Sequence, residues 1–181
     1  MDDTGIIWYF PAKMAQKHKI PSWQLYGEDS PFPDILHIEK IIDRAAGLDW
    51  QIGPHRHLHL HQIFLILSGQ VRLTLDGAPT PAAPPVLLNI PRGTVHGFSF
   101  SAATEGYVLT LPAADFPELF GPQAETLTHL NRPFTAAAPS DIVAPFDAIA
   151  ALHALPGPLR RLRLRAAALS LCCAAFDPPP P

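Results

Sequence analysis

The chain has 181 residues, of which 48% are hydrophobic, and its formal net charge at pH 7 is -3 with histidine counted as neutral. These values suit one domain with a full core, and the missing basic excess argues against a dedicated nucleic-acid-binding protein. The two cysteines, Cys172 and Cys173, are neighbours, so no disulfide framework is expected and a reducing, cytoplasmic compartment is favoured. The sequence shows no signal peptide and no apolar run of the roughly 18 residues that a membrane span needs.

Residues 1–34 are interrupted by several prolines and show no regular pattern, so we expect an irregular arm there. Short β-like runs follow, and turn signals such as Ser68-Gly69 and Asp76-Gly77 separate them. The runs cover residues 35–41, 63–68, 70–77, 86–90, 96–101 and 106–111. Because no helical pattern intervenes, residues 35–112 predict an antiparallel sandwich or barrel rather than a parallel α/β sheet.

Residues 113–176 differ in character and favour helices at 113–120, 139–155 and 157–176. The last helix carries an apolar stripe with spacings of 3 and 4 residues, which is typical of packing between helices. The stripe consists of Leu159, Leu162, Ala166, Leu169 and Cys173. The arginines of the same helix indicate a solvated face or an interface rim, because no other basic surface extends them into a nucleic-acid footprint. We expect the proline-rich residues 177–181 to form an extended tail.

Four histidines occupy alternate positions in the stretch "GPHRHLHLH", residues 53–61. Side chains two positions apart share one face of a strand, so His55 and His57 are expected to point the same way. His96 follows the "PRG" turn and offers a third imidazole from a neighbouring strand. Such a cluster predicts either a metal site or the polar lining of a ligand cavity.

Gln62 offers a possible fourth, oxygen-bearing donor. Its parity relative to His57 is wrong for one unbroken strand, so a bend or bulge between the two residues is required. We expect His59 and His61 to lie in a solvated loop or at a strand edge, where they at most contact the side chains that ligate the metal.

Two spaced motifs resemble those of the cupin superfamily, which are H-x-H-x(3,4)-E-x6-G and P-x-G-x2-H-x3-N. In this chain they read His55-x-His57-x4-Gln62-x6-Gly69 and Pro91-x-Gly93-x2-His96. The departures are Gln62 in place of Glu, Phe100 in place of the final Asn, and Asp49 and Pro85 in place of the opening glycines.

This resemblance implies a mainly β fold, the double-stranded β-helix or jelly-roll barrel of cupins, here with C-terminal α-helices. It also implies a divalent metal such as Zn, Ni or Fe, held by His55, His57, His96 and Gln62. Loss of the glutamate removes the anionic ligand from this set.

A closer resemblance links the chain to the N-terminal sensor domain of AraC-type transcription regulators, in the branch that responds to hydroxybenzoate or hydroxyphenylacetate. The similar stretches are "IPSWQLYGE", "DWQIGPHRHLHLHQIFLILSG", "LLNIPRGTVHGFSFS" and "EGYVLTL". It implies a small aromatic acid as effector and a homodimer formed through the C-terminal helices. The helix-turn-helix half of such regulators would follow Pro181, so no direct DNA binding is expected from this chain.

The candidate ligand-binding groups lie beside these motifs. Gln62 can hydrogen-bond a bound organic acid, and the guanidinium of Arg92 matches a carboxylate. Strand alternation is expected to turn Arg56 away from the histidines. The aromatic candidates for an apolar pocket are Trp50, Phe64, Phe98 and Tyr107.

The sequence therefore favours small-molecule sensing. The alternative is a metal-dependent cupin enzyme, such as a dioxygenase or an isomerase, since three histidines with an open coordination position make a workable catalytic site. We assign no catalytic residue, because the sequence contains neither a nucleophile turn nor a glycine-rich phosphate loop. A purely structural or dimerisation module is the third possibility.

Overall fold

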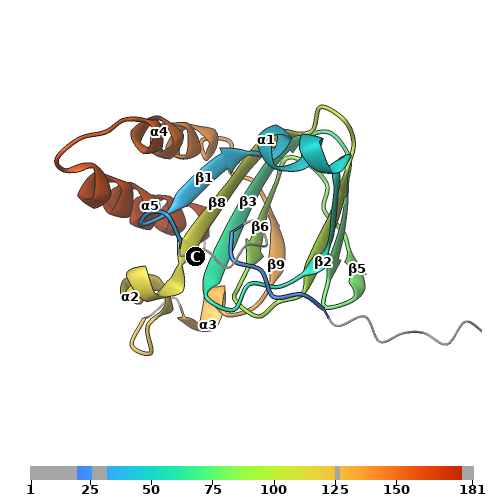
Figure 1. Ribbon diagram of the computed structural model, residues 1–181, viewed down its shortest axis with the longest axis horizontal. Coiled ribbons are helices and arrows are strands. Elements are labelled where there is room, and N and C mark those ends of the chain that lie inside the picture. Colours follow the sequence, from blue (N-terminus) through green and yellow to red (C-terminus); the bar gives the residue numbers. More distant parts are fainter. Residues whose placement is uncertain (1–19, 26–31, 125–126, 177–181) are drawn as a thin grey trace, which may run out of the picture.

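The computed structural model describes residues 20–25, 32–124 and 127–176, and it contains two antiparallel β-sheets that face each other (Figure 1). The five-stranded sheet has the order β1 (His37–Lys40), β8 (Glu105–Pro112), β3 (Leu60–Ser68), β6 (Val86–Ile90) and β9 (Phe134–Ala137). The four-stranded sheet has the order β2 (Gln51–His55), β7 (His96–Phe100), β4 (Val71–Leu75) and β5 (Ala78–Thr80). The mainly β barrel expected from the sequence is confirmed.

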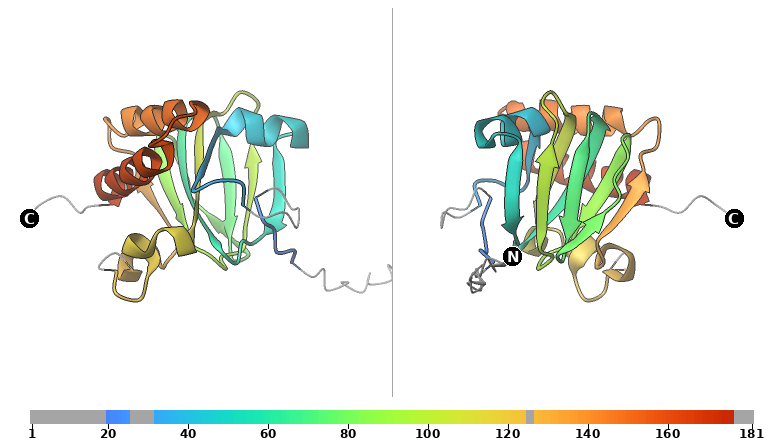
Figure 2. Two further views of the ribbon diagram at one scale, coloured as in Figure 1. Left: turned by 60° about the vertical axis from the view of Figure 1, so that its left-hand side comes forward. Right: turned by 90° about the vertical axis from the view of Figure 1, so that its right-hand side faces the viewer.

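Helices cover one end and one side of this barrel. The helix α1 (Ile41–Ala45) and the 3₁₀ turn η1 (Ala46–Leu48) lie at one end, between the sheets (Figure 1). Figure 2 shows α4 (Val143–Ala154) and α5 (Arg160–Phe176) on the outer side of the five-stranded sheet. The short elements after β8 are η2 (Ala113–Asp115), α2 (Pro117–Phe120) and α3 (Leu127–Leu130).

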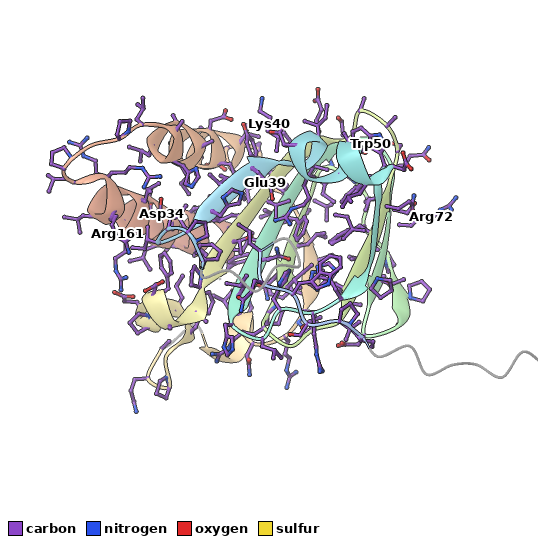
Figure 3. The ribbon with its side chains drawn as sticks, viewed as in Figure 1. Asp34, Glu39, Lys40, Trp50, Arg72 and Arg161 are labelled. Atoms are coloured by element: carbon purple, nitrogen blue, oxygen red, sulfur yellow. The ribbon has the colours of Figure 1, made fainter. Side chains whose placement is uncertain are left out.

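The apolar run in β3 reflects burial of both faces of the five-stranded sheet. Phe64 and Ile66 point between the sheets, whereas Ile63 and Leu65 pack with the helices outside. A strand buried on both sides loses the alternation of polar and apolar residues. In β4 the alternation remains, because Leu73 is buried between the sheets while the side chain of Arg72 points away from the barrel (Figure 3).

Two expectations for the C-terminal part are corrected. The strand β9 lies inside the segment expected to be helical, and it pairs with β6 at the sheet edge. The face of α5 that packs on the protein consists of Leu164, Ala168, Leu171 and Cys172. The predicted stripe is not this face: Leu159 precedes α5 and Leu162 lies on another side, with exposed fractions of 54% and 63%, while Leu169 is only partly buried against the core.

The expected arm falls mostly outside the described residues, and the expected proline tail does so entirely. Within the described part of the arm, Ser22 forms an isolated bridge with Arg56 beside β2. None of the helices in the described residues combines the length and the apolar character that a bilayer span requires.

Candidate metal and ligand site

Three buried histidines meet inside the barrel. His55 ends β2 and His96 begins β7, and the two residues are directly paired between these strands. With His57, they place one potential ligand nitrogen each within 4.8 Å of one another. A tetrahedral zinc site has Zn–N distances of about 2.0–2.1 Å and thus nitrogens about 3.4 Å apart, so small inward movements would complete such a site.

A change of sheet explains how His57 and Gln62 both reach the interior. The strands β2 and β3 belong to different sheets, so residues 56–59 cross from one sheet to the other. The crossing is held by a hydrogen bond of 2.7 Å from the Gly93 N–H to the His57 carbonyl. This crossing provides the break between His57 and Gln62 that the parity argument requires.

Backbone carbonyls fix the tautomer of all three imidazoles. The Nδ1 atoms of His55, His57 and His96 lie 2.9, 2.9 and 3.0 Å from the carbonyl oxygens of Gly53, Trp23 and Thr94. A carbonyl oxygen only accepts, so each Nδ1 donates a proton and each Nε2 keeps its lone pair. This orientation is typical of metal-binding histidines, whose second nitrogen is held by a hydrogen bond.

Burial keeps the cluster neutral. Burial, together with the neighbouring imidazoles and the positive charge of Arg44, lowers the pKa of His55 to about 4 and that of His96 to about 3. At neutral pH both imidazoles are therefore unprotonated, which is the form that binds metal.

Gln62 adds an oxygen to the same interior surface. Its side chain is 3% exposed, and its Nε2 donates to Thr110 Oγ1 at 3.3 Å. Among the described residues, neither Gln62 Oε1 nor His96 Nε2 has a hydrogen-bond partner, although both atoms are buried. A buried acceptor without a donor is unfavourable, and a cation satisfies several acceptors at once. The lone pairs of Gln62 Oε1 and His96 Nε2 are therefore suited to bind a divalent metal.

A cavity of about 300 Å³ adjoins the histidines. Its wall combines apolar side chains with a few polar groups, as is usual for small-molecule sites. The lining residues are Trp23, Asp43, Arg44, Gly47, Leu48, Ile52, His55, Gln62, Phe64, His96 and Phe98. The Trp23 ring stacks on His55 with centroids 4.0 Å apart, and the rings of Phe64 and Phe98 are 4.6 Å apart.

The aromatic and arginine candidates divide between the cavity and other places. Phe64 and Phe98 line the cavity, whereas Trp50 is half-buried against the inner core and does not line it. Tyr107 points out of the barrel towards α4. Its hydroxyl donates a hydrogen bond of 2.6 Å to Oδ1 of Asp147, a residue of that helix. Arg92 is exposed in the turn before β7 and is absent from the cavity wall.

His61 also differs from its expectation. It is 1% exposed rather than solvated, because it points to the outer face of β3. Its Nε2 donates to Asn89 Oδ1 at 2.7 Å, and its ring stacks on Phe120 at 4.4 Å. His59 is exposed, as expected.

Several residues of the cavity wall were not among the candidates named from the sequence, and Trp23 and Arg44 are the two that matter most for the site. Trp23 lies in the segment read as an irregular arm, and Arg44 lies in a short helix without a motif. No local pattern indicates that either residue reaches the cavity, since both positions depend on the tertiary fold.

Comparison with known proteins supports this description. Residues 48–111 match the family model described as the cupin domain. The match covers the strands β2 to β8 of the barrel, so this segment is similar to a cupin domain. No curated protein matches the whole sequence significantly.

Several solved structures are similar to parts of the chain. The match with KdgF from Halomonas sp. has 24% sequence identity and a TM-score of 0.32, and it covers 34% of this chain and 57% of KdgF. A Cupin 2 conserved barrel domain protein from Salinispora arenicola is 19% identical over 48% of this chain and 73% of its own, with a TM-score of 0.33. A salicylate 1,2-dioxygenase variant from Pseudoaminobacter salicylatoxidans is 15% identical over 50% of this chain and 23% of its own, with a TM-score of 0.31. The chain thus spans little more than half of KdgF, and at these scores none of the three informs the function of this chain.

Proposed function

We propose that the chain is the cytoplasmic effector-binding domain of an AraC-type transcription regulator, with a small aromatic acid bound in the cupin cavity. In this proposal His55, His57 and His96 hold a divalent metal such as Zn, Ni or Fe, and Gln62 supplies a fourth ligand or a contact to the effector. The bound metal would act as a Lewis acid that fixes the polar end of the ligand.

The observation that carries this proposal is the set of acceptor atoms facing a partly apolar cavity. The oriented imidazoles supply lone pairs for a cation, while Phe64 and Phe98 offer a surface for an aromatic ring. The sequence similarity to sensor domains supports the aromatic acid. In those regulators a separate helix-turn-helix domain binds DNA, so we propose no DNA contact for the described residues.

The chemical groups on the cavity wall favour ligand binding over catalytic turnover. The carboxylate among its described lining residues is that of Asp43, which is exposed on α1. A buried general base beside the histidines is therefore not among those residues, and acid–base catalysis has little support. The alternative, a metal-dependent cupin enzyme, is favoured by the cluster of three histidines, of which His55 and His96 line the cavity, since such a set leaves coordination positions for a substrate.

Metal content of the untagged protein tests the site. Elemental analysis after incubation with Zn, Ni or Fe salts should give close to one ion per chain, and His96→Ala should lose it. His59→Ala is the matched control, because this exposed histidine lies in the same stretch. Absence of metal from the unmodified protein would contradict a metal site.

A second measurement separates sensing from catalysis. Metal-loaded protein is mixed with 3-hydroxybenzoate in air, and the compound is followed by chromatography. Binding without consumption supports the sensor, whereas turnover that is lost in His96→Ala supports the enzyme.

A second copy of the chain is the partner that we propose. The exposed stripe with Leu159 and Leu162 has the spacing of a helix that packs on another helix. In a homodimer, the α5 helices of the two copies would bury this stripe against each other.

A further inference from the structure

The helix α1 brings one arginine to the cavity wall. Arg44 lines the cavity, and its side chain is 11% exposed. Its Nε lies 2.5 Å from Glu39 Oε1 on β1, and its Nη1 donates to the Leu25 carbonyl at 2.7 Å. Two separate parts of the chain therefore hold the guanidinium in place.

Arg44 is more deeply buried than Asp43, the carboxylate on the cavity wall. Asp43 is exposed to solvent, where water screens its charge, whereas Arg44 is nearly buried. Glu39 offsets part of the free-energy cost of burying the guanidinium. A guanidinium carries five N–H donors in a planar fork, so it can bind several acceptors at the same time.

We propose that Arg44 binds the carboxylate of the ligand, so that the cavity selects small aromatic acids over their neutral analogues. This inference rests on the proposed function and names the residue that recognises the acid. The ring then lies against Phe64 and Phe98, which line the same cavity, and its other polar group faces the histidines. Arg44 takes the role that the sequence analysis gave to Arg92, which is exposed outside the cavity.

The test compares an acid with its neutral analogue. Zinc-loaded full-length chain is titrated by calorimetry with 3-hydroxybenzoate and with 3-hydroxybenzamide, which have nearly the same shape. The unmodified protein should bind the acid at least about tenfold more tightly, as expected for a charge-assisted hydrogen bond.

Three variants assign this preference to the residue. Arg44→Met should weaken binding of the acid by about 10- to 100-fold and leave binding of the amide unchanged. Arg44→Lys keeps the charge but not the fork, so it should lose less affinity. Arg72→Met is the matched control, because Arg72 points away from the barrel and should leave both affinities unchanged (Figure 3).

The outcomes separate this inference from the proposed function. Equal affinity of the unmodified protein for acid and amide, or an acid preference that survives in Arg44→Met, overturns the role of Arg44 and leaves the sensor proposal standing. Binding of neither probe contradicts both. Should Arg44→Met fail to fold in a thermal unfolding control, the acid–amide comparison in the unmodified protein and in Arg44→Lys decides the question.

Discussion

Gln62 stands at the position of the anionic ligand in the cupin motif, and its buried amide oxygen accepts no hydrogen bond from the described residues. Gln62→Glu would place a carboxylate at this position, which attracts a cation but is unfavourable in a buried site without one. We expect metal binding to tighten by at least about tenfold, and the metal-free variant to unfold at a lower temperature than the unmodified protein. Competition with a chelating dye measures the first effect, and Gln62→Leu is the control. An unchanged metal affinity would show that this side chain does not reach the ion.

His61 couples stability to pH on the other face of the same strand. Burial lowers its pKa from 6.5 to about 4 in the folded protein. As the pH falls from 6.5 towards 4, His61 is protonated in the unfolded chain but not in the folded one. Protonation therefore favours unfolding, and the free energy of unfolding should drop by up to about 3 kcal/mol from this residue over that range.

Urea unfolding with a metal chelator present, at several pH values, tests this coupling. His61→Gln keeps an N–H donor for Asn89 but cannot titrate, so its stability should depend less steeply on pH between 6.5 and 4. His59→Gln, at an exposed position, should leave the pH dependence as it is. Identical slopes for His61→Gln and the unmodified protein would contradict the assignment.

Individual site residues were predictable where their signal is local. The spacing of His55 and His57 and the turn before His96 named the three histidines that the structure brings together, although β2 ends at His55 and His57 lies in the crossing between the sheets. Arg44 reaches the cavity only because α1 covers the end of the barrel, which no spacing reveals. Tyr107 was placed on the wrong side because both faces of β8 are buried, and its aromatic character fits either one.

Among the strands, the close approach of β8 to β3 depends on one glycine. Gly106 has a φ of +150°, and a Cβ added there would lie 2.0 Å from the Leu65 carbonyl oxygen. Gly106→Ala must therefore push β8 away from β3, the central strand of the five-stranded sheet. We expect a loss of about 3 kcal/mol or more in the free energy of unfolding.

Chemical denaturation of Gly106→Ala measures this loss. Gly47→Ala is the control, because an added Cβ there meets nothing within 4 Å, and its stability should change little. A Gly106→Ala variant as stable as the unmodified protein would mean that the paired strands β8 and β3 can move apart at this position without loss of stability, which would contradict the prediction.

Strands with strong patterns were predicted well, whereas the edge strands β2, β5 and β9 were not among the predicted runs. The six predicted runs correspond to β1, β3, β4, β6, β7 and β8. The edge strands β5 and β9 have three and four residues, too few for a periodic pattern, and β5 contains a proline. Their assignment depends on pairing with a neighbour, which is information from the tertiary fold.

At the scale of the whole molecule, α5 has two apolar sides, one that packs on the protein and one that is exposed. Leu164, Ala168 and Leu171 are buried against the protein, whereas Leu162 on another side is 63% exposed. The sequence alone does not say which side faces the barrel, since both repeat at helical spacing. Once the fold assigns the first side to the core, the second is left for a partner, and the proposed homodimer gives it one.

Leu162→Glu tests this assembly without touching the core. A charge on each copy would be buried in the proposed helix–helix contact, so the variant should be monomeric at concentrations at which the unmodified chain is a dimer. Light scattering coupled to gel filtration measures the mass, and an unchanged unfolding temperature at monomer concentrations shows that the fold is intact. Ile42→Glu is the matched control, because Ile42 is 46% exposed on α1 and should not affect the mass. An unmodified chain that stays monomeric at all concentrations, or a Leu162→Glu variant that still dimerises, would place the contact elsewhere and leave the exposed side of α5 for a different partner.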